Sequence, residues 1–135
     1  MMPKQLVVAI ALTLGFVGAI QATEPRSFEL FEISNHDNPS LRYQFSRAAA
    51  TSDDPVVIAA VGREFKKSDR ENRVDLQKVW LQHNVPKKMK LVSRFLVTEC
   101  GRKHHGKWDA CDVYTFADSK GTRVDYYIYV GNWPD

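Results

Sequence analysis

A period of two in the positions of apolar residues begins the body of the chain. After the β-prone run 28–33 comes the turn-rich segment 34–40, and beyond it Leu41, Tyr43 and Phe45 alternate with polar residues. Alternation of this kind is typical of a half-buried strand. The pattern predicts a β-hairpin with a seven-residue loop, and the polar residues of that loop are interpreted as stabilising a surface turn.

The segment around residue 56 carries conflicting signals. Asp54 and Pro55 suit the first positions of a helix, because aspartate can accept the free amides there and proline fits the first turn. The residues 56–58 that follow are β-branched and favour a strand. We expect a helix over about 54–67 and keep the strand as the alternative.

A clearer helix signal follows. Ser68 and Glu71 have the spacing of a capping box, and Pro86 lies where a helix must end. Between them, side chains at helical spacing share one face: Leu76, Val79, Trp80 and, one turn further, His83. These features predict a helix over 69–84, with His83 at the edge of the core.

From residue 88 the period returns to two. Three β-prone runs separated by turn signals predict a C-terminal three-stranded meander over about 88–130. The turn at 118–121 suits a three-residue loop in which Gly121 is left-handed. Together with the preceding hairpin, these elements predict an α+β fold in which an antiparallel sheet is packed by one or two helices.

The two cysteines suggest a register for the meander. If Cys100 faces Cys111, then Phe95 lies opposite Phe116. The turn predicts two pairs between the second and third strands: Tyr114 with Tyr126, and Phe116 with Val124. One face then holds the apolar residues of all three strands: Phe95, Val97, Tyr114, Phe116, Val124, Tyr126, Ile128 and Val130. A one-residue slip would place charged side chains there, so we expect this register, with the helices covering that face.

An apolar run precedes all of these elements. Residues 6–20 are apolar with few interruptions, Lys4 lies before them, and small residues follow. This is the pattern of a secretory signal peptide, and the run is shorter than the roughly 20 residues of a membrane-spanning helix. We expect a signal peptide at 1–22, and a single small domain at 23–135 that does not insert into the membrane.

Composition narrows the possible compartment and partners. Removing Lys4 with the signal leaves 19 − 1 = 18 basic residues against 16 acidic ones, a net charge of +2. This near-neutral balance argues against a nucleic-acid partner, whose binders show a strong basic excess. Two cysteines in an exported chain predict one disulfide, between Cys100 and Cys111, and a periplasmic or secreted location.

The predicted disulfide closes a loop rich in cationic and aromatic residues. We expect the partner to contact the loop through Arg102, Lys103, His104, His105, Lys107 and Trp108. A closed loop loses less entropy on binding than an open one. This plan resembles that of periplasmic inhibitors of vertebrate lysozyme, in which a short disulfide-closed loop with a histidine blocks the catalytic cleft, and of some periplasmic immunity proteins. No motif is shared with them, so the likeness is one of plan.

The sequence therefore predicts a protein-binding module that inhibits or neutralises an enzyme or toxin acting in the cell envelope. We expect no enzymatic activity, cofactor or metal, because the chain holds no motif of the common hydrolases, metalloproteases or nucleotide-binding enzymes. A loop closed only for stability is one alternative. Another is a small hydrolase that uses histidine acid–base chemistry, drawing on His36, His83, His104 and His105. A third is a small-ligand carrier with a pocket lined by Trp80 and Tyr126.

Overall fold

Two three-stranded antiparallel sheets and one helical segment make up the described part of the chain. The computed structural model describes residues 26–101 and 109–134. The elements in chain order are β1 (Phe31–Ser34), β2 (Arg42–Phe45), β3 (Ile58–Ala60), the 3-10 helix η1 (Lys67–Asn72), α2 (Arg73–Asn84), β4 (Lys90–Val97), β5 (Cys111–Ala117) and β6 (Arg123–Tyr129). The expected α+β class and C-terminal meander are confirmed. Among these elements, no helix has both the length and the apolar character needed to cross a bilayer.

The first sheet has the strand order β1-β2-β3 and contains the predicted hairpin. Strands β1 and β2 pair antiparallel, with Phe31 opposite Phe45. In the loop between them, the Asn35 side-chain oxygen accepts hydrogen bonds from the amides of Asp37 and Asn38, at 2.9 and 3.0 Å. The interpretation of these polar residues as turn stabilisers is confirmed.

The helix expected over about 54–67 is wrong, and the alternative strand is correct. Strand β3 lies within this segment and pairs with β2, with Ile58 opposite Phe45. The Asp54 carboxylate accepts the amide of Ala49 at 2.9 Å, so it serves the preceding loop and does not cap a helix. The β-branched residues of this segment fit the pleated surface of a sheet, and that preference prevails over the helix-start pattern.

The helix expected over 69–84 is confirmed, but it begins differently. Its first six residues form η1, and α2 continues to Asn84, just before Pro86. The start is stabilised by Asp69 and not by Ser68, because the Asp69 carboxylate accepts the Lys66 amide at 2.7 Å. The capping box therefore begins two residues earlier than predicted, with Lys66 at the N-cap and Asp69 three residues on.

Strands β5 and β6 pair in the predicted register. Tyr114 lies opposite Tyr126, and Phe116 lies opposite Val124. The turn between the strands closes with a hydrogen bond from the Asp118 amide to the Thr122 carbonyl, 3.1 Å long. Gly121 has a φ of +85°, the left-handed conformation expected for it.

The predicted register of β4 is wrong. Phe95 lies opposite Val113, and Val97 lies opposite Cys111. The prediction assumed that the cysteines face each other within the ladder, but β4 ends at Val97, so Cys100 lies beyond the ladder while Cys111 pairs with Val97. The difference of three positions is odd, so Phe95 and Val97 lie on the opposite face of the sheet from Tyr114 and Tyr126.

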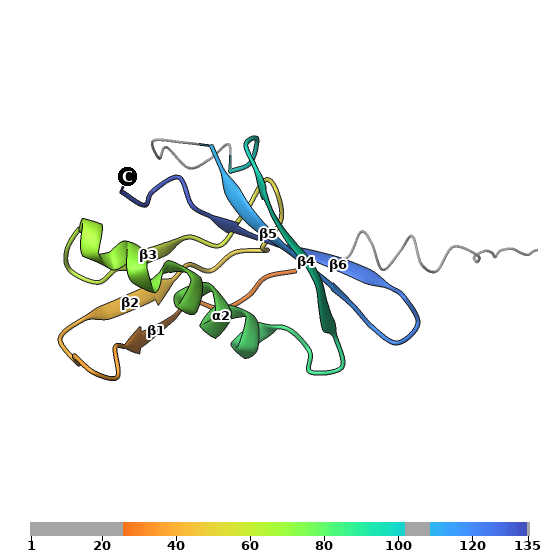
Figure 1. Cartoon of the computed structure of the whole chain (residues 1–135), viewed down its shortest axis with the longest axis horizontal. Coiled ribbons are helices and arrows are strands. Elements are labelled where there is room, and N and C mark those ends of the chain that lie inside the picture. Colours follow the sequence, from red (N-terminus) through yellow and green to blue (C-terminus); the bar gives the residue numbers. More distant parts are fainter. Residues whose placement is uncertain (1–25, 102–108, 135) are drawn as a thin grey trace, which may run out of the picture.

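The main core lies where α2 and the two sheets meet (Figure 1). Its largest contributions are Tyr43, Phe45 and Ile58 from the first sheet, Leu76, Trp80 and Leu81 from α2, and Tyr114, Tyr126 and Ile128 from the second sheet. Trp80 packs edge-to-face on Tyr126, with ring centroids 5.9 Å apart, and both side chains are buried. Both rings belong to the core, which does not favour the carrier alternative with its pocket lined by Trp80 and Tyr126. At the edge, His83 stacks on Phe31 at 4.2 Å, as predicted for a core-edge histidine.

Candidate functional site

The loop predicted to contact a partner is described only at its base. The six predicted contact residues, Arg102, Lys103, His104, His105, Lys107 and Trp108, lie outside the described residues. The disulfide between Cys100 and Cys111 is present, and both cysteines are buried. A disulfide indicates an extracellular or otherwise oxidising compartment.

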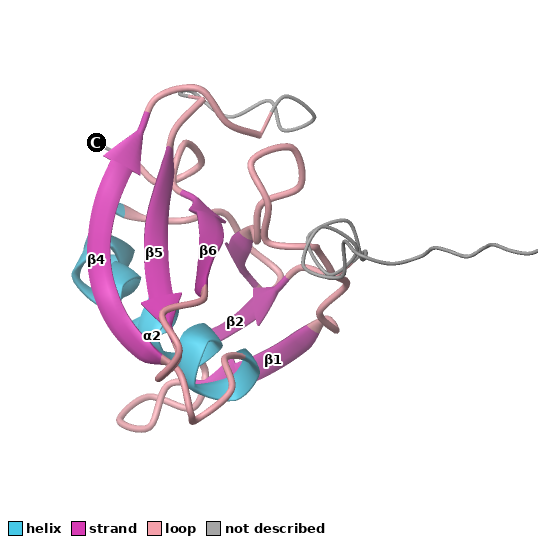
Figure 2. Ribbon diagram, turned by 90° about the vertical axis from the view of Figure 1, so that its right-hand side faces the viewer, coloured by secondary structure: helices cyan, strands magenta, loops and turns pink. Residues whose placement is uncertain are grey.

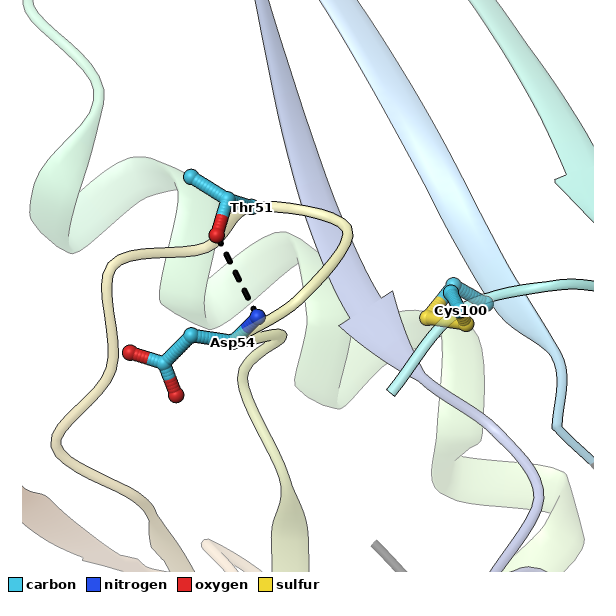
Figure 3. The surroundings of a disulfide bond; sticks show 4 residues. Thr51, Asp54 and Cys100 are labelled. Carbon is cyan, nitrogen blue, oxygen red and sulfur yellow. Dashed lines mark hydrogen bonds between the residues drawn. A yellow bond between two sulfur atoms is a disulfide. The ribbon is translucent and has the colours of Figure 1, made fainter. Parts of the chain in front are cut away.

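The base of this loop is held against a turn from the other half of the chain. The Gly101 amide donates to the Ser52 carbonyl at 2.8 Å. Ser52 belongs to a turn in which the Asp54 amide donates to the Thr51 hydroxyl at 3.2 Å, and Figure 3 shows this turn together with the disulfide. The disulfide itself packs against Tyr129 in a small second core. These contacts therefore hold the base of the loop against the body of the protein.

Replacing Gly101 with alanine is expected to lower the free energy of unfolding by about 2 kcal/mol. Gly101 has a φ of +67°, and an added Cβ would lie 3.1 Å from Tyr129 and 3.3 Å from Pro55. Chemical denaturation measures the loss. Gly62→Ala is the control, since Gly62 has a φ of +75° but no atom within 4 Å of the added Cβ. Equal losses in the two variants would contradict the close packing at Gly101.

Strand β4 leads to the base of this loop and is exposed along almost its whole length. Four large apolar side chains on it are about half exposed: Leu91 (55%), Val92 (46%), Phe95 (45%) and Leu96 (59%). Within the part of the chain that the structure describes, β4 pairs with β5 alone in the order β4-β5-β6, so its outer backbone groups face away from the sheet (Figure 2). A long, exposed, apolar edge strand readily accepts another strand.

The other edge of the same sheet is closed. The Val56 amide donates to the Tyr127 carbonyl at 3.0 Å, and the Tyr129 amide donates to the Val56 carbonyl at 2.8 Å. A further bond joins the Tyr127 amide to the Ala50 carbonyl at 3.0 Å. The segment 50–56 thus occupies the outer edge of β6, and β4 provides the open edge of this sheet.

Positive charge gathers on the exposed strand and just before it. Lys87 and Lys88 precede it, and Lys90 and Arg94 lie on it, whereas it carries no acidic residue. Lys87, Lys88 and Lys90 are exposed. A cationic edge of this kind attracts an acidic partner and opposes pairing with a second copy of itself.

A buried polar network supports β4 from the helix side. The Asp112 carboxylate accepts hydrogen bonds from Gln77 at 2.8 Å and from Arg94 at 3.2 Å, and the Tyr114 hydroxyl donates to the Gln77 side-chain oxygen. Burial raises the pKa of Tyr114, so this hydroxyl keeps its proton at neutral pH. The network joins α2, β4 and β5 and fixes the direction of the Arg94 side chain.

The two described histidines lie on different elements. His36 lies in the β1–β2 loop, whereas His83 lies on α2 and stacks on Phe31. Within 26–101 and 109–134, no three histidine, cysteine, aspartate or glutamate side chains cluster as a metal site would require. His104 and His105, which the hydrolase alternative also invoked, lie outside the described residues.

The exposure of β4 was not predicted from the sequence, although a signal for it was present. Leu91 with Val92, and Phe95 with Leu96, are adjacent apolar pairs that place apolar side chains on both faces of one strand. Such a pattern indicates either a strand buried on both sides or an edge prepared for a partner.

No family model matches the chain, and comparison with curated proteins and with solved structures finds no significant similarity.

Proposed function

We propose that the chain is a protein-binding module that pairs its strand β4 with an extended segment of an acidic partner protein. The observation that carries this proposal is the open eight-residue edge of β4 with its four half-exposed apolar side chains. In strand addition, main-chain hydrogen bonds supply affinity and alternate side chains supply specificity. The exposed leucines and phenylalanine provide apolar contacts on both faces of the added strand.

The charge around β4 supports an acidic partner over self-association. Lys90 and Arg94 on the strand would be joined by the same charges from a second copy, with no acidic residue of β4 to offset them. The Asp112 carboxylate already pairs with Arg94, but the lysines have no ion pair with a described residue. Complementary charge therefore comes from the partner, and it also accelerates association.

The loop predicted from the sequence begins close to the end of β4. Cys100 follows the end of β4 by three residues, and the closed loop begins there. A partner strand laid along β4 reaches this loop, whose cationic and aromatic residues then make the contacts proposed for Lys103, His104, His105, Lys107 and Trp108. We infer that the partner is an enzyme or toxin of the cell envelope, which the module inhibits or neutralises from the periplasm or the secreted state.

Binding to purified envelope-acting enzymes tests this function. Oxidised protein 23–135 is assayed against a panel of lysozymes and other peptidoglycan-active enzymes, with affinity and residual enzyme activity both measured. The double variant Leu91→Glu, Leu96→Glu is expected to bind about 30-fold more weakly, because each leucine loses about 1 kcal/mol of apolar contact. Leu30→Glu is the matched control, since Leu30 is 52% exposed but lies outside β4. Its affinity should be unchanged.

Two outcomes would overturn parts of the proposal. If the β4 variant binds normally while combined Lys103→Glu, Lys107→Glu and Trp108→Ala changes abolish binding, the loop alone is the contact surface. Turnover of an envelope substrate by the purified protein, lost in His36→Ala or His83→Ala variants that remain folded, would identify a hydrolase in place of a binding module.

A further inference from the structure

A cavity of about 620 Å³ lies between the start of the helix, strand β4 and the C-terminal residues. Its size is in the range that holds a small organic molecule. Four separate segments contribute to its wall: Arg70 and Arg73 from η1 and α2, residues 94–98 of the β4 region, residues 109–112 at the loop base, and residues 130–134 of the tail. None of these segments is close to all of the others in sequence, so only the folded chain forms this cavity.

The charges on the cavity wall leave a surplus of one. Three arginines (Arg70, Arg73, Arg94) and two aspartates (Asp109, Asp112) line it, which gives +3 − 2 = +1. Arg94 and Asp112 pair with each other at 3.2 Å. Arg70 and Arg73 make no ion pair with any described residue, so binding an anion breaks no existing salt bridge.

Two hydrogen-bond donors on the wall lack acceptors. The Nε of Arg73 and the indole Nε1 of Trp133 are both buried, and neither has a hydrogen-bond partner within the described ranges. Trp133 is only 4% exposed, held by stacking on Phe65 at 3.9 Å. Buried donors in native proteins are almost always paired. A ligand bearing acceptor oxygens would supply partners once a small shift of the two side chains exposed these N–H groups, which solvent does not reach in this structure.

The rest of the wall is mostly apolar. It consists of Phe95, Leu96, Thr98, Ala110, Val130, Trp133 and Pro134. An apolar wall beside cationic groups suits a molecule with one charged end and an uncharged hydrocarbon body.

We propose that this cavity binds a small organic monocarboxylate with an apolar body. Arg70 and Arg73 hold the carboxylate, since guanidinium groups match the geometry of its two oxygens. Trp133 donates its indole N–H to the same end of the ligand, and the body lies along Leu96 and Val130. A monoanion balances the surplus of one charge, whereas a phosphate dianion would leave a net charge of +1 − 2 = −1 at the wall. This site shares Leu96 with the edge proposed to receive a partner strand, but Arg70 and Arg73, which hold the carboxylate, lie outside β4.

Titration of the oxidised protein with 3-phenylpropanoate tests the site. Binding is followed by NMR through the indole N–H signal of Trp133, assigned from its loss in Trp133→Phe. We expect an affinity at least tenfold above that for the neutral 3-phenylpropanol, acetate or inorganic phosphate, because only the first probe satisfies both the charge and the apolar wall.

Two variants locate the ligand. Arg73→Gln is expected to weaken binding of 3-phenylpropanoate about tenfold, while Arg123→Gln removes the same charge from an exposed position at the far end of β6 and should have no effect. Trp133→Phe, which keeps the stacked ring, should weaken binding several-fold as judged by a ligand-observed NMR signal. Equal weakening in the two arginine variants, preference for phosphate, or no binding of the carboxylate at 10 mM, well above a millimolar dissociation constant, would overturn the proposal.

Discussion

Replacing Asp69 with asparagine is expected to lower the free energy of unfolding by about 3 kcal/mol at neutral pH. Its carboxylate is 3% exposed and accepts four hydrogen bonds: from Arg63 at 2.8 and 3.0 Å, from the Tyr43 hydroxyl at 2.7 Å and from the Lys66 amide at 2.7 Å. Asparagine presents a donor where the carboxylate accepts, and it leaves the Arg63 charge unpaired. The loss would be read from urea denaturation with the slope held common to both proteins.

The same group predicts how acid affects the fold. The Arg63 guanidinium, with the Lys66 amide and Tyr43 hydroxyl, holds the pKa of Asp69 well below its usual range despite burial. A depressed pKa stabilises the folded state fully above the unfolded value of about 4, and this contribution is lost as pH falls below it. The natural protein should therefore lose more stability between pH 5 and pH 2 than Asp69→Asn does.

A neutral replacement elsewhere provides the control. Asp37 is exposed in the β1–β2 loop, and its carboxylate makes no hydrogen bond or ion pair with a described residue. Asp37→Asn should therefore leave both stability at pH 7 and its dependence on pH unchanged. If Asp69→Asn cost less than about 1 kcal/mol, or followed the same acid profile as the natural protein, the cluster around Asp69 would not be a major source of stability.

Removing the disulfide by the double change Cys100→Ala, Cys111→Ala is expected to cost about 3 kcal/mol of unfolding free energy. The bond joins residues 11 apart and closes a 12-residue loop, so it restricts the unfolded chain by the corresponding loop entropy. Alanine is chosen because both cysteines are buried beside Tyr129, where serine would add an unpaired hydroxyl.

Reduction of the natural protein offers an independent measurement of the same quantity. Dithiothreitol should lower its stability toward that of the double-alanine variant, and should leave the variant unaffected. A loss below about 1 kcal/mol in both experiments would mean that the base of the loop is held by its packing and by the Gly101 bond to Ser52, with little contribution from the covalent link. These stability values also show at which temperatures the reduced protein stays folded, so that its binding can be measured there.

Local patterns were sufficient where neighbouring residues decide the structure. The β1–β2 hairpin, the helix ending before Pro86 and the pairing of Tyr114 with Tyr126 were all predicted correctly. In each case a period of two or of 3.6 is joined to a nearby turn or cap. A three-residue turn allows one register between the strands on either side of it. The pairing of β5 with β6 can therefore be predicted from that part of the sequence alone.

The incorrect predictions concern elements whose partners are distant in the chain. The segment 56–58 has nearly balanced local preferences, and pairing with β2 decides in favour of a strand. Strand β4 is separated from β5 by a 13-residue connection, which sets no register, and the cysteines proved a misleading guide to it. Long connections leave the choice of register to side-chain packing across the sheet.

The candidate sites depend on tertiary structure most of all. Residue types and their order determined by themselves the α+β class, the disulfide and the amphipathic elements, because these require only short-range periodicity and chain closure. Leu91 and Leu96 are exposed because β4 lies at an edge of its sheet. Arg73 and Trp133 line the same cavity because the tail folds against the start of the helix. The exposure of a side chain and the charges around it depend on residues that are close in space but distant in sequence. Only the folded chain therefore determines them.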